Sequence, residues 1–293
     1  MTALARPPRL GLVSPVVLRV PGAHSPWEET AGIAELVTVA QTADELGYDH
    51  LTCSEHVAVP VEVAKRRGGT YWDPLATFGH LAAHTRRIRL ATHVLVLGYH
   101  HPLEIAKRYG TLDLISGGRL VLGLGVGTLE EEFALLGAEF GDRGARADDA
   151  LAALRSSLSR AEPEYHGSHY DYSGMVVEPH AVQPRVPLWI GGSTRRSLRR
   201  ALELGDGWAP FGLAFDHLGE LLAGVERPDG FEVVHSPARP LDPGGDPQGA
   251  EFLLRQARQA GATVLGVRIA ADSADHYCAQ LETLARVAEA AGP

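Results

Sequence analysis

Eight short apolar runs alternate with eight helix-like segments along this chain, and this alternation restricts the fold more than any other feature. The runs are bounded by turn residues and are apolar throughout, as buried parallel strands are. The segments between them space their apolar residues as amphipathic helices do. The expected strands are 9–15, 48–54, 88–97, 119–125, 187–192, 207–212, 231–237 and 264–270, and the expected helices are 26–46, 74–84, 102–115, 148–160, 193–204, 215–225, 249–260 and 274–290.

Eight strand–helix units in 293 residues predict an α/β fold, a closed (β/α)8 TIM-type barrel. A doubly wound open sheet is the main alternative, because it also alternates parallel strands with helices. No Pro- or Ser-rich linker interrupts the pattern. We therefore expect residues 1–293 to form one domain.

Several longer segments outside this pattern follow expected strands, at 57–73, 98–101, 126–147 and 211–215. Loops that follow the strands of a barrel gather at its C-terminal face, where active sites form. We therefore expect the functional residues in or beside these segments. Another segment, which begins at Tyr165, alternates like a small hairpin before the fifth strand.

The chain carries 27 Lys and Arg against 36 Asp and Glu, a net charge of -9. Nucleic-acid binding relies on clustered positive charge, so no nucleic-acid partner is expected. No run approaches the roughly 18 apolar residues of a membrane span, and the N-terminal residues lack a signal-peptide cleavage pattern. We expect a cytoplasmic protein without a membrane segment. Cys53 and Cys278 lie far apart and indicate neither a disulfide nor a cysteine metal site.

A glycine-rich stretch, GLGVGT at 123–128, follows an expected strand. Its spacing is G-x-G-x-G, whereas dinucleotide folds use G-x-G-x-x-G, and the acidic run at 130–132 leaves no clear helix start. A Rossmann site is therefore not predicted. Gly125 and Gly127 instead allow the backbone to turn out of the strand or to approach a flat ligand closely.

The stretch IGGSTRRSLRR combines a strand end with a helix start. Gly191 and Gly192 end the strand, and Ser193 and Thr194 open the helix, so backbone N–H groups and the positive end of the helix dipole converge where a phosphate could sit. An ordinary strand-to-helix turn with a serine cap is the alternative. Barrel phosphate sites recur on loops after late strands, which favours the phosphate interpretation.

Two histidines lie near the expected barrel mouth. His93 is inside the apolar stretch LATHVLVL, and His56 follows the preceding strand. A lone histidine in an apolar strand is more often a hydrogen-bonded core residue than a catalyst. No metal is expected, because the first strand lacks a His-x-His pair and later strand ends lack carboxylates. Glycines for a planar ring, a phosphate cradle and a titratable histidine indicate a flavin-like cofactor with a nearby proton donor or acceptor.

A resemblance to a known family is carried by SEHV, TRRIRLATHVLVLGYHHP, LDLISGGRLVLGLGVGTLEEEF, RG at 143–144, PLWIGGS and GDGW. In order and spacing these stretches are similar to the luciferase-like monooxygenase superfamily, and most of all to its coenzyme F420-dependent oxidoreductases. The resemblance extends from about residue 9 to residue 212. It implies a bacterial luciferase-like barrel that binds F420, a deazaflavin, and transfers a hydride between its C5 and a small organic substrate.

The resemblance also implies roles for single residues. The family's acidic residue and histidine after the second strand match Glu55 and His56, with His56 as the acid/base and Glu55 at the cofactor, although some members have Asp at the first position. Family members carry a non-proline cis peptide on the third strand, and the matching bond joins His93 and Val94.

The turn after the fourth strand aligns with a family carboxylate, which falls on Glu130. Leu129 stands where the sugar-phosphate enzymes of the family have Gly, which weakens the match. The Lys and Arg residues that hold sugar phosphates have no counterpart, so that substrate class is disfavoured. The expected catalytic residues are therefore His56 and Glu130, and the expected cofactor-binding residues are Glu55, His93, Val94, Gly127, Thr128, Gly191, Gly192 and Ser193.

Two other functions remain open on the same fold. One is an FMN-dependent monooxygenase that uses reduced flavin and O2, because FMN shares a ring shape and a ribityl phosphate with F420. The other is a non-catalytic barrel that binds a flavin-type ligand. The resemblance further implies a homodimer.

Overall fold

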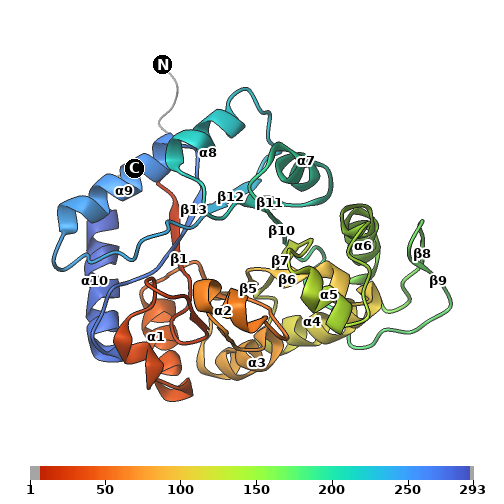
Figure 1. Cartoon of the computed structure of the whole chain (residues 1–293), viewed down its shortest axis with the longest axis horizontal. Coiled ribbons are helices and arrows are strands. Elements are labelled where there is room, and N and C mark those ends of the chain that lie inside the picture. Colours follow the sequence, from red (N-terminus) through yellow and green to blue (C-terminus); the bar gives the residue numbers. More distant parts are fainter. Residues whose placement is uncertain (1–6, 291–293) are drawn as a thin grey trace.

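Eight parallel strands close on themselves to form a barrel (Figure 1). The computed structural model describes residues 7–290. The barrel strands are β1 (Arg9–Leu12), β3 (His50–Cys53), β5 (Arg89–Thr92), β7 (Leu120–Gly125), β10 (Leu188–Gly191), β11 (Gly207–Ala209), β12 (Glu232–His235) and β13 (Val264–Val267). The barrel closes because β10 pairs with both β7 and β11, and β13 pairs with both β12 and β1. The predicted TIM-type barrel is confirmed, and the open sheet is wrong.

A long helix follows each barrel strand and packs outside it (Figure 1). These helices are α1 (Ile33–Glu45), α3 (Pro74–His84), α4 (Pro102–Ser116), α6 (Arg143–Ser157), α7 (Arg195–Leu204), α8 (Phe215–Leu222), α9 (Pro247–Gln259) and α10 (Ala274–Ala290). Their apolar faces and the outer faces of the strands form one large core. Within residues 7–290, no helix combines the length and the apolar character that crossing a bilayer requires.

Short elements occupy the connections. They are β2 (Leu18–Arg19), η1 (Pro26–Glu29), α2 (Val61–Arg67), β4 (Thr70–Tyr71), β6 (Leu95–Val96), η2 (Leu97–Tyr99), α5 (Glu130–Leu135), β8 (Tyr165–His166) and β9 (Asp171–Tyr172). β2 pairs with β4, so the loop after β1 is tied to the loop after β3. β8 and β9 pair as the expected hairpin.

Several predicted helix boundaries differ from the structure. The predicted helix 26–46 is split into η1 and α1, because Gly32 is extended and its N–H donates to Glu35 Oε2 at 2.8 Å, which starts a new helix. α6 begins earlier than predicted, at Arg143. α5 begins directly at Glu130, so a helix does open after the glycine-rich stretch, contrary to the prediction.

One apolar layer fills the barrel interior, and its largest side chain is the indole of Trp189. Six strands contribute one inward residue each: Ala91, Val121, Trp189, Ala209, Val234 and Val264. His50 packs edge-on against Trp189, with ring centroids 5.1 Å apart. A Cβ on Gly11 would lie 2.2 Å from the His50 ring, so glycine is needed there for the ring to fit.

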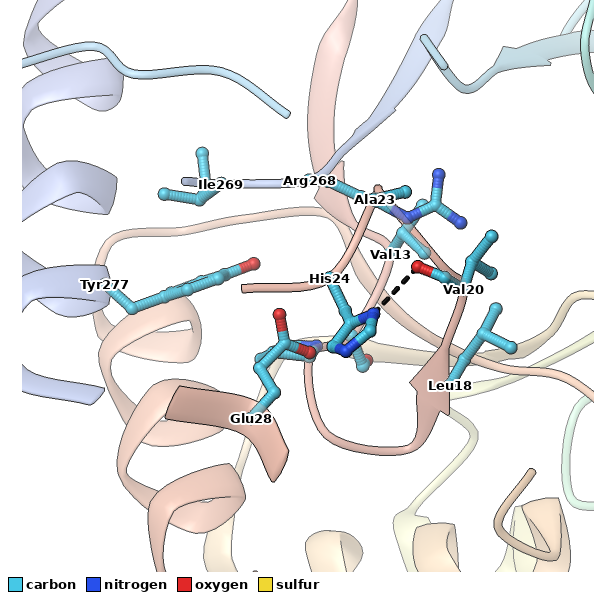
Figure 2. Close-up of a pocket in the computed structure, with 11 residues that line it drawn as sticks. Val13, Leu18, Val20, Ala23, His24, Glu28, Arg268, Ile269 and Tyr277 are labelled. Carbon is cyan, nitrogen blue, oxygen red and sulfur yellow. Dashed lines mark hydrogen bonds between the residues drawn. The ribbon is translucent and has the colours of Figure 1, made fainter. Parts of the chain in front are cut away.

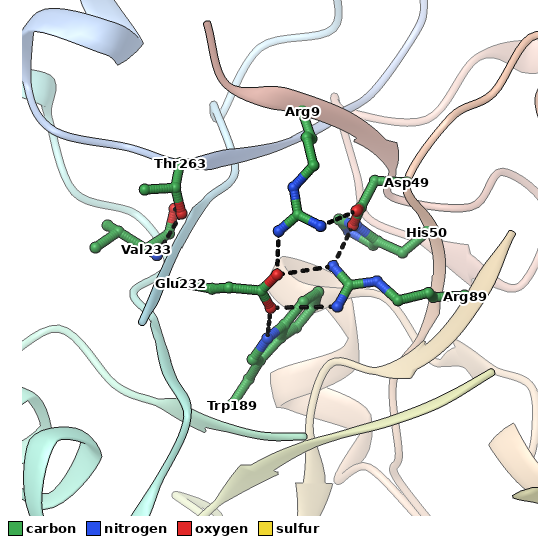
Figure 3. A network of polar contacts seen from close by, with 8 residues as sticks. All are labelled: Arg9, Asp49, His50, Arg89, Trp189, Glu232, Val233 and Thr263. Atoms are coloured by element: carbon green, nitrogen blue, oxygen red, sulfur yellow. Dashed lines mark hydrogen bonds and ion pairs between the residues drawn. The ribbon is translucent and has the colours of Figure 1, made fainter. Parts of the chain in front are cut away.

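An ion network closes the N-terminal end of the barrel (Figure 3). Glu232 accepts hydrogen bonds from Arg9, from Arg89 at 3.2 Å and from Trp189 Nε1 at 2.6 Å. Asp49 pairs with Arg9 at 2.7 Å and with Arg89 at 2.5 Å. The four charged residues come from the first positions of four strands or just before them, and Trp189 is the second residue of a fifth, so the network ties strand ends that are far apart in sequence.

The network keeps the carboxylate of Asp49 ionised. Burial opposes the ionisation of Asp49, but the hydrogen bond from His50 and the charges of Arg89 and Arg9 hold the pKa of its carboxyl well below the ordinary value. Burial likewise opposes the charge of Arg89, yet Asp49 and Glu232 raise the pKa of its guanidinium.

We predict that Glu232→Ala lowers the free energy of unfolding by about 3 kcal/mol, because it leaves the indole N–H of Trp189 without its acceptor and leaves Arg9 and Arg89 to share Asp49. Urea denaturation of the purified chain measures the change. Glu226→Ala, in an exposed loop, is the control and should change stability by less than about 0.5 kcal/mol. Equal effects of the two substitutions would contradict a stabilising role for the network.

Candidate active site

The C-terminal ends of the strands and the loops after them form the mouth of the barrel, opposite the ion network. The loop after β3 carries Glu55 and His56, and the β5–β6 junction carries His93 and Val94. The segment after β7 carries α5, and the loop after β10 leads into α7. Residues predicted from separate stretches of sequence therefore meet at one end of the barrel.

His56 forms a hydrogen-bonded pair with Glu132, a residue that the sequence analysis did not select. His56 Nδ1 lies 2.7 Å from Glu132 Oε2, and the Tyr99 hydroxyl donates to the same oxygen at 2.7 Å. The other oxygen accepts the backbone N–H groups of Val57 at 2.6 Å and Ala58 at 3.2 Å. Glu132 thus holds both the imidazole and the loop that carries it.

The charge of Glu132 determines what His56 can do. Burial alone would raise the pKa of Glu132, but hydrogen bonds from Tyr99, His56 and the two backbone N–H groups outweigh it and hold the pKa below its ordinary value. An ionised carboxylate only accepts, so Nδ1 of His56 carries a proton. Nε2 of the neutral ring is then left free to take up a proton. The Tyr71 ring packs edge-on against the imidazole, with centroids 4.5 Å apart.

Glu130, the expected catalytic carboxylate, is exposed at the first position of α5. Leu129, Glu132 and Phe133 are buried instead, and their i, i+3, i+4 spacing places them on one helix face. That spacing is the sequence signal that identifies Glu132, once a helix is assigned to this segment. Among residues 7–290, Glu130 makes no side-chain hydrogen bond or ion pair, and its catalytic role stays a prediction.

Both oxygens of Glu55 are engaged within the chain. Oε2 accepts the N–H of Val96 at 2.7 Å, and Oε1 lies 2.7 Å from His100 Nε2. Burial lowers the pKa of the His100 imidazole, but the hydrogen bond and charge of Glu55, together with the charge of Glu104, raise it, and the net shift is upward. Glu55 therefore anchors the segment after β5 to the segment after β3. Its expected contact with a cofactor is a prediction that the geometry does not test.

The bond between His93 and Val94 is cis, as the resemblance implied, and it divides the predicted strand 88–97 into β5 and β6. Cβ atoms added to Gly125 and Gly191 would lie 2.6 and 2.8 Å from the methyl groups of Val94. Two neighbouring strands therefore use glycine where the Val94 side chain enters the mouth.

His93 is neutral at neutral pH. Burial, followed by the charges of His50 and Arg268, lowers the pKa of its imidazole to about 4. Its Nε2 is buried and has no hydrogen-bond partner within the described part of the chain. A buried polar atom of this kind usually has a partner, so Nε2 is available to a ligand or an ordered water at the mouth.

A cavity of about 490 Å³ lies between the start of α6 and the start of α7, and its lining includes Gly191, Gly192, Ser193, Thr194 and Arg196. Gly192 has φ +116°, a conformation that side chains disfavour. The N-cap residue of α7 is Thr194, whose hydroxyl accepts the N–H of Ser197 at 3.2 Å. The predicted serine cap at 193 is therefore one residue early, and the predicted helix start at 193 is two residues early. The N–H groups of the first two helical residues have no partner within the helix and face this region.

Arg143 lines this cavity together with Arg196 and Arg200. Its guanidinium stacks 3.7 Å from the centroid of the Phe140 ring and donates to the carbonyl of Gly127 at 3.3 Å. The Gly127 turn is left-handed at φ +79°, and an added Cβ would lie 2.5 Å from Phe133. Thr128, beside it, accepts a hydrogen bond from Arg67 at 3.2 Å. The expected cofactor residues Gly127 and Thr128 are thus tied to two arginines.

No three His, Cys, Asp or Glu side chains within residues 7–290 group as a metal site would require. The described mouth instead offers a paired imidazole, a valine side chain between glycines, and a positively charged cradle at a helix start. These are groups that hold an anionic, flat cofactor and move a proton beside it.

The comparisons with known proteins concern most of the chain. A family model described as luciferase-like monooxygenase matches residues 15–236. An uncharacterized protein of Mycobacterium tuberculosis is 30% identical over 203 residues, which cover 65% of this chain and 70% of that protein.

Two solved structures share the fold. The coenzyme F420-dependent tetrahydromethanopterin reductase of Methanopyrus kandleri aligns with a TM-score of 0.65 and 16% identity, over 85% of this chain and 72% of that one. The oxygenating constituent of 3,6-diketocamphane monooxygenase of Pseudomonas putida, in complex with FMN, aligns with a TM-score of 0.68 and 15% identity, over 96% and 97% of the two chains.

The lowered pKa of Glu132 gives a pH-dependent prediction. The charge of Glu132 stabilises the folded chain fully at pH values above 4.5, the ordinary pKa of a glutamate. This stabilisation is lost as the pH falls through the lower pKa that Glu132 has in the folded chain. We expect Glu132→Gln to be less stable than the unsubstituted chain at pH 7, with the difference shrinking below about pH 4.5. Urea denaturation at several pH values measures this. Glu130→Gln is the control, and a similar pH-dependent loss in that variant would contradict the assignment.

Proposed function

The chain belongs to the luciferase-like monooxygenase family, and on that premise we propose that it is a coenzyme F420-dependent oxidoreductase with His56 as its acid/base. The observation that carries the proposal is the His56–Glu132 pair at the barrel mouth. Reduction of a C=O or C=N group by a hydride requires a proton at the heteroatom, and the reverse reaction requires its removal. A histidine oriented by an ionised carboxylate serves both directions.

The residues of the mouth fit a deazaflavin cofactor. The glycine turn at 191–192, the free N–H groups at the start of α7, Arg196 and Arg143 would hold the phosphate. Val94, bracketed by Gly125 and Gly191, would support the ring. When bound, F420 supplies a hydride donor or acceptor at C5 of the deazaflavin.

The remaining groups act on the proton. Nε2 of His56 takes up or releases the proton of the substrate heteroatom, while Nδ1–H stays hydrogen-bonded to Glu132. The carboxylate stabilises the imidazolium that forms when the ring holds both protons. The Tyr99 hydroxyl and two backbone N–H groups keep the carboxylate in place, so the imidazole does not need to reorient during the reaction.

An FMN-dependent monooxygenase is the second candidate. It is supported by the likeness to the diketocamphane monooxygenase, which was solved with FMN and aligns over 96% of this chain. The same cradle would hold the FMN phosphate. The His56–Glu132 pair favours F420, because hydride transfer to a carbonyl or an imine needs the adjacent proton donor.

Cofactor choice is tested by spectral titration of the purified chain with F420 and, separately, with FMN. We expect F420 to bind more tightly. Gly192→Ala should weaken binding by about tenfold, because its Cβ would lie 2.9 Å from Ser197 Cβ and the left-handed backbone disfavours a side chain.

Gly224→Ala is the matched control, since Gly224 also has a positive φ, of +71°, but has nothing within 4 Å of an added Cβ. Tighter binding of FMN would favour the monooxygenase, and no binding of either cofactor would exclude both functions.

The acid/base role of His56 is tested by His56→Gln. Reduced F420 is supplied with a panel of small carbonyl and imine compounds, and its reoxidation is followed by absorbance. We expect kcat for an accepted compound to fall by about 10²- to 10⁴-fold, with the cofactor affinity unchanged. His217→Gln, at an exposed site on α8, is the control. Full turnover by the His56 variant would refute the role.

A further inference from the structure

A small polar cavity lies beside the barrel mouth, outside the phosphate cradle and the His56–Glu132 pair (Figure 2). It is formed by the segment after β1 and the end of β13, and its volume of about 10 Å³ is close to the space of one water molecule. The hydroxyls of Ser14 and Tyr277 line it, and both are buried without a hydrogen-bond partner in residues 7–290. Buried hydroxyls normally have partners, and one water molecule in a cavity of this size would supply them.

Arg268 brings a cation to the same cavity. Side chains alternate along β13, where Val264 belongs to the interior layer and the next outward residue, Leu265, to the outer core. Arg268 therefore faces inward, one step beyond the strand end, and lies near enough to His93 to lower the pKa of that imidazole. Figure 2 shows its guanidinium beside Val13 and Val20, pointing away from Tyr277.

The guanidinium of Arg268 makes no hydrogen bond or ion pair with any residue from 7 to 290. Glu28 is nearby, but its two oxygens accept the N–H groups of Val16 at 2.9 Å and Ser25 at 2.8 Å. Burial lowers the pKa of Arg268, and Tyr277 and Glu28 offset this only in part. Arg89, with two carboxylate partners, shows the opposite shift. A half-buried cation without a partner costs stability that an incoming anion would restore.

The position of Arg268 relates this cation to the reaction. β13 lies next to β1, and β1 lies next to β3, whose loop carries His56. The phosphate cradle follows β10, which is separated from β13 by two strands on the other side of the barrel. His56 and Arg268 therefore flank the end of β1, on the side of the mouth away from the cradle.

We propose that Arg268 binds a carboxylate group of the substrate at the barrel mouth, next to this one-water cavity and not inside it. This inference rests on the proposed function, since it places the substrate between Arg268 and His56. A guanidinium matches a carboxylate through two parallel N–H donors. A phosphate dianion fits less well, because Arg268 is the only Lys or Arg among the residues that line this cavity. The substrate class is a small carboxylic acid that also carries the group reduced or oxidised beside His56.

The test is isothermal titration calorimetry of the full chain with two matched pairs of probes, benzoate with benzamide and octanoate with octanamide. We expect at least one carboxylate to bind roughly ten- to 100-fold more tightly than its amide. Arg268→Gln should abolish this preference, and Arg268→Lys should keep part of it. Arg268→Lys keeps a cation at this position, so it tests the site independently if Arg268→Gln is poorly folded.

Arg199→Gln, on the exposed face of α7, is the control and should retain the full preference. Equal affinities of the unsubstituted chain for acid and amide in both pairs would overturn the proposal, as would an unchanged preference in Arg268→Gln. Titration of the same samples with F420 and FMN separates the two ideas. Failure to bind either cofactor would contradict the proposed function, while the carboxylate preference would still report on Arg268.

Discussion

A closed eight-stranded barrel has to fill its own interior, and in this chain the orientation of Trp189 governs how that is done. The indole is fully buried, its Nε1 donates to Glu232, and His50 packs against its edge. The small interior residues around it, such as Ala91, leave the space that it occupies. Glu232 also accepts a hydrogen bond from Arg9. The Glu232 side chain therefore connects the apolar layer, through Trp189, to the ion network. The N-terminal end of the barrel is thereby sealed.

A barrel closed at one end can use the other end for chemistry. The residues at the mouth include glycines that accommodate a neighbour, such as Gly125 and Gly191 around Val94, and polar atoms without a partner in residues 7–290, such as His93 Nε2. Such features lower stability when they occur in a core. Here the large outer core and the sealed end lie away from the mouth and stabilise the fold, so the mouth can keep unsatisfied groups available to a ligand.

The barrel was predictable because each strand–helix unit carries its own periodicity, and eight units leave few topologies. The hydrogen-bond partner of His56 could not be predicted in the same way. The family resemblance aligned a carboxylate with Glu130, whereas the helix face shared with Phe133 buries Glu132. The acceptor role of Glu55 toward Val96 was also beyond local patterns, because it depends on where the broken third strand resumes. Arg268 lies in a part of the chain without a recognisable motif, and only its missing partner in three dimensions draws attention to it.

The distribution of charge around the mouth also supports binding of anionic ligands there. The chain has 36 acidic against 27 basic residues, so carboxylates to pair with its arginines are not scarce. Arg89 and its neighbours at the sealed end are paired accordingly. Within residues 7–290, Arg196 and Arg268 line two separate cavities at the mouth without an ion pair. Two unpaired cations beside cavities at the mouth fit the anionic cofactor and the anionic substrate proposed above. One cavity lies at the cradle and the other across the mouth beyond His56, which is the arrangement that an anionic cofactor and an anionic substrate meeting at the imidazole would require.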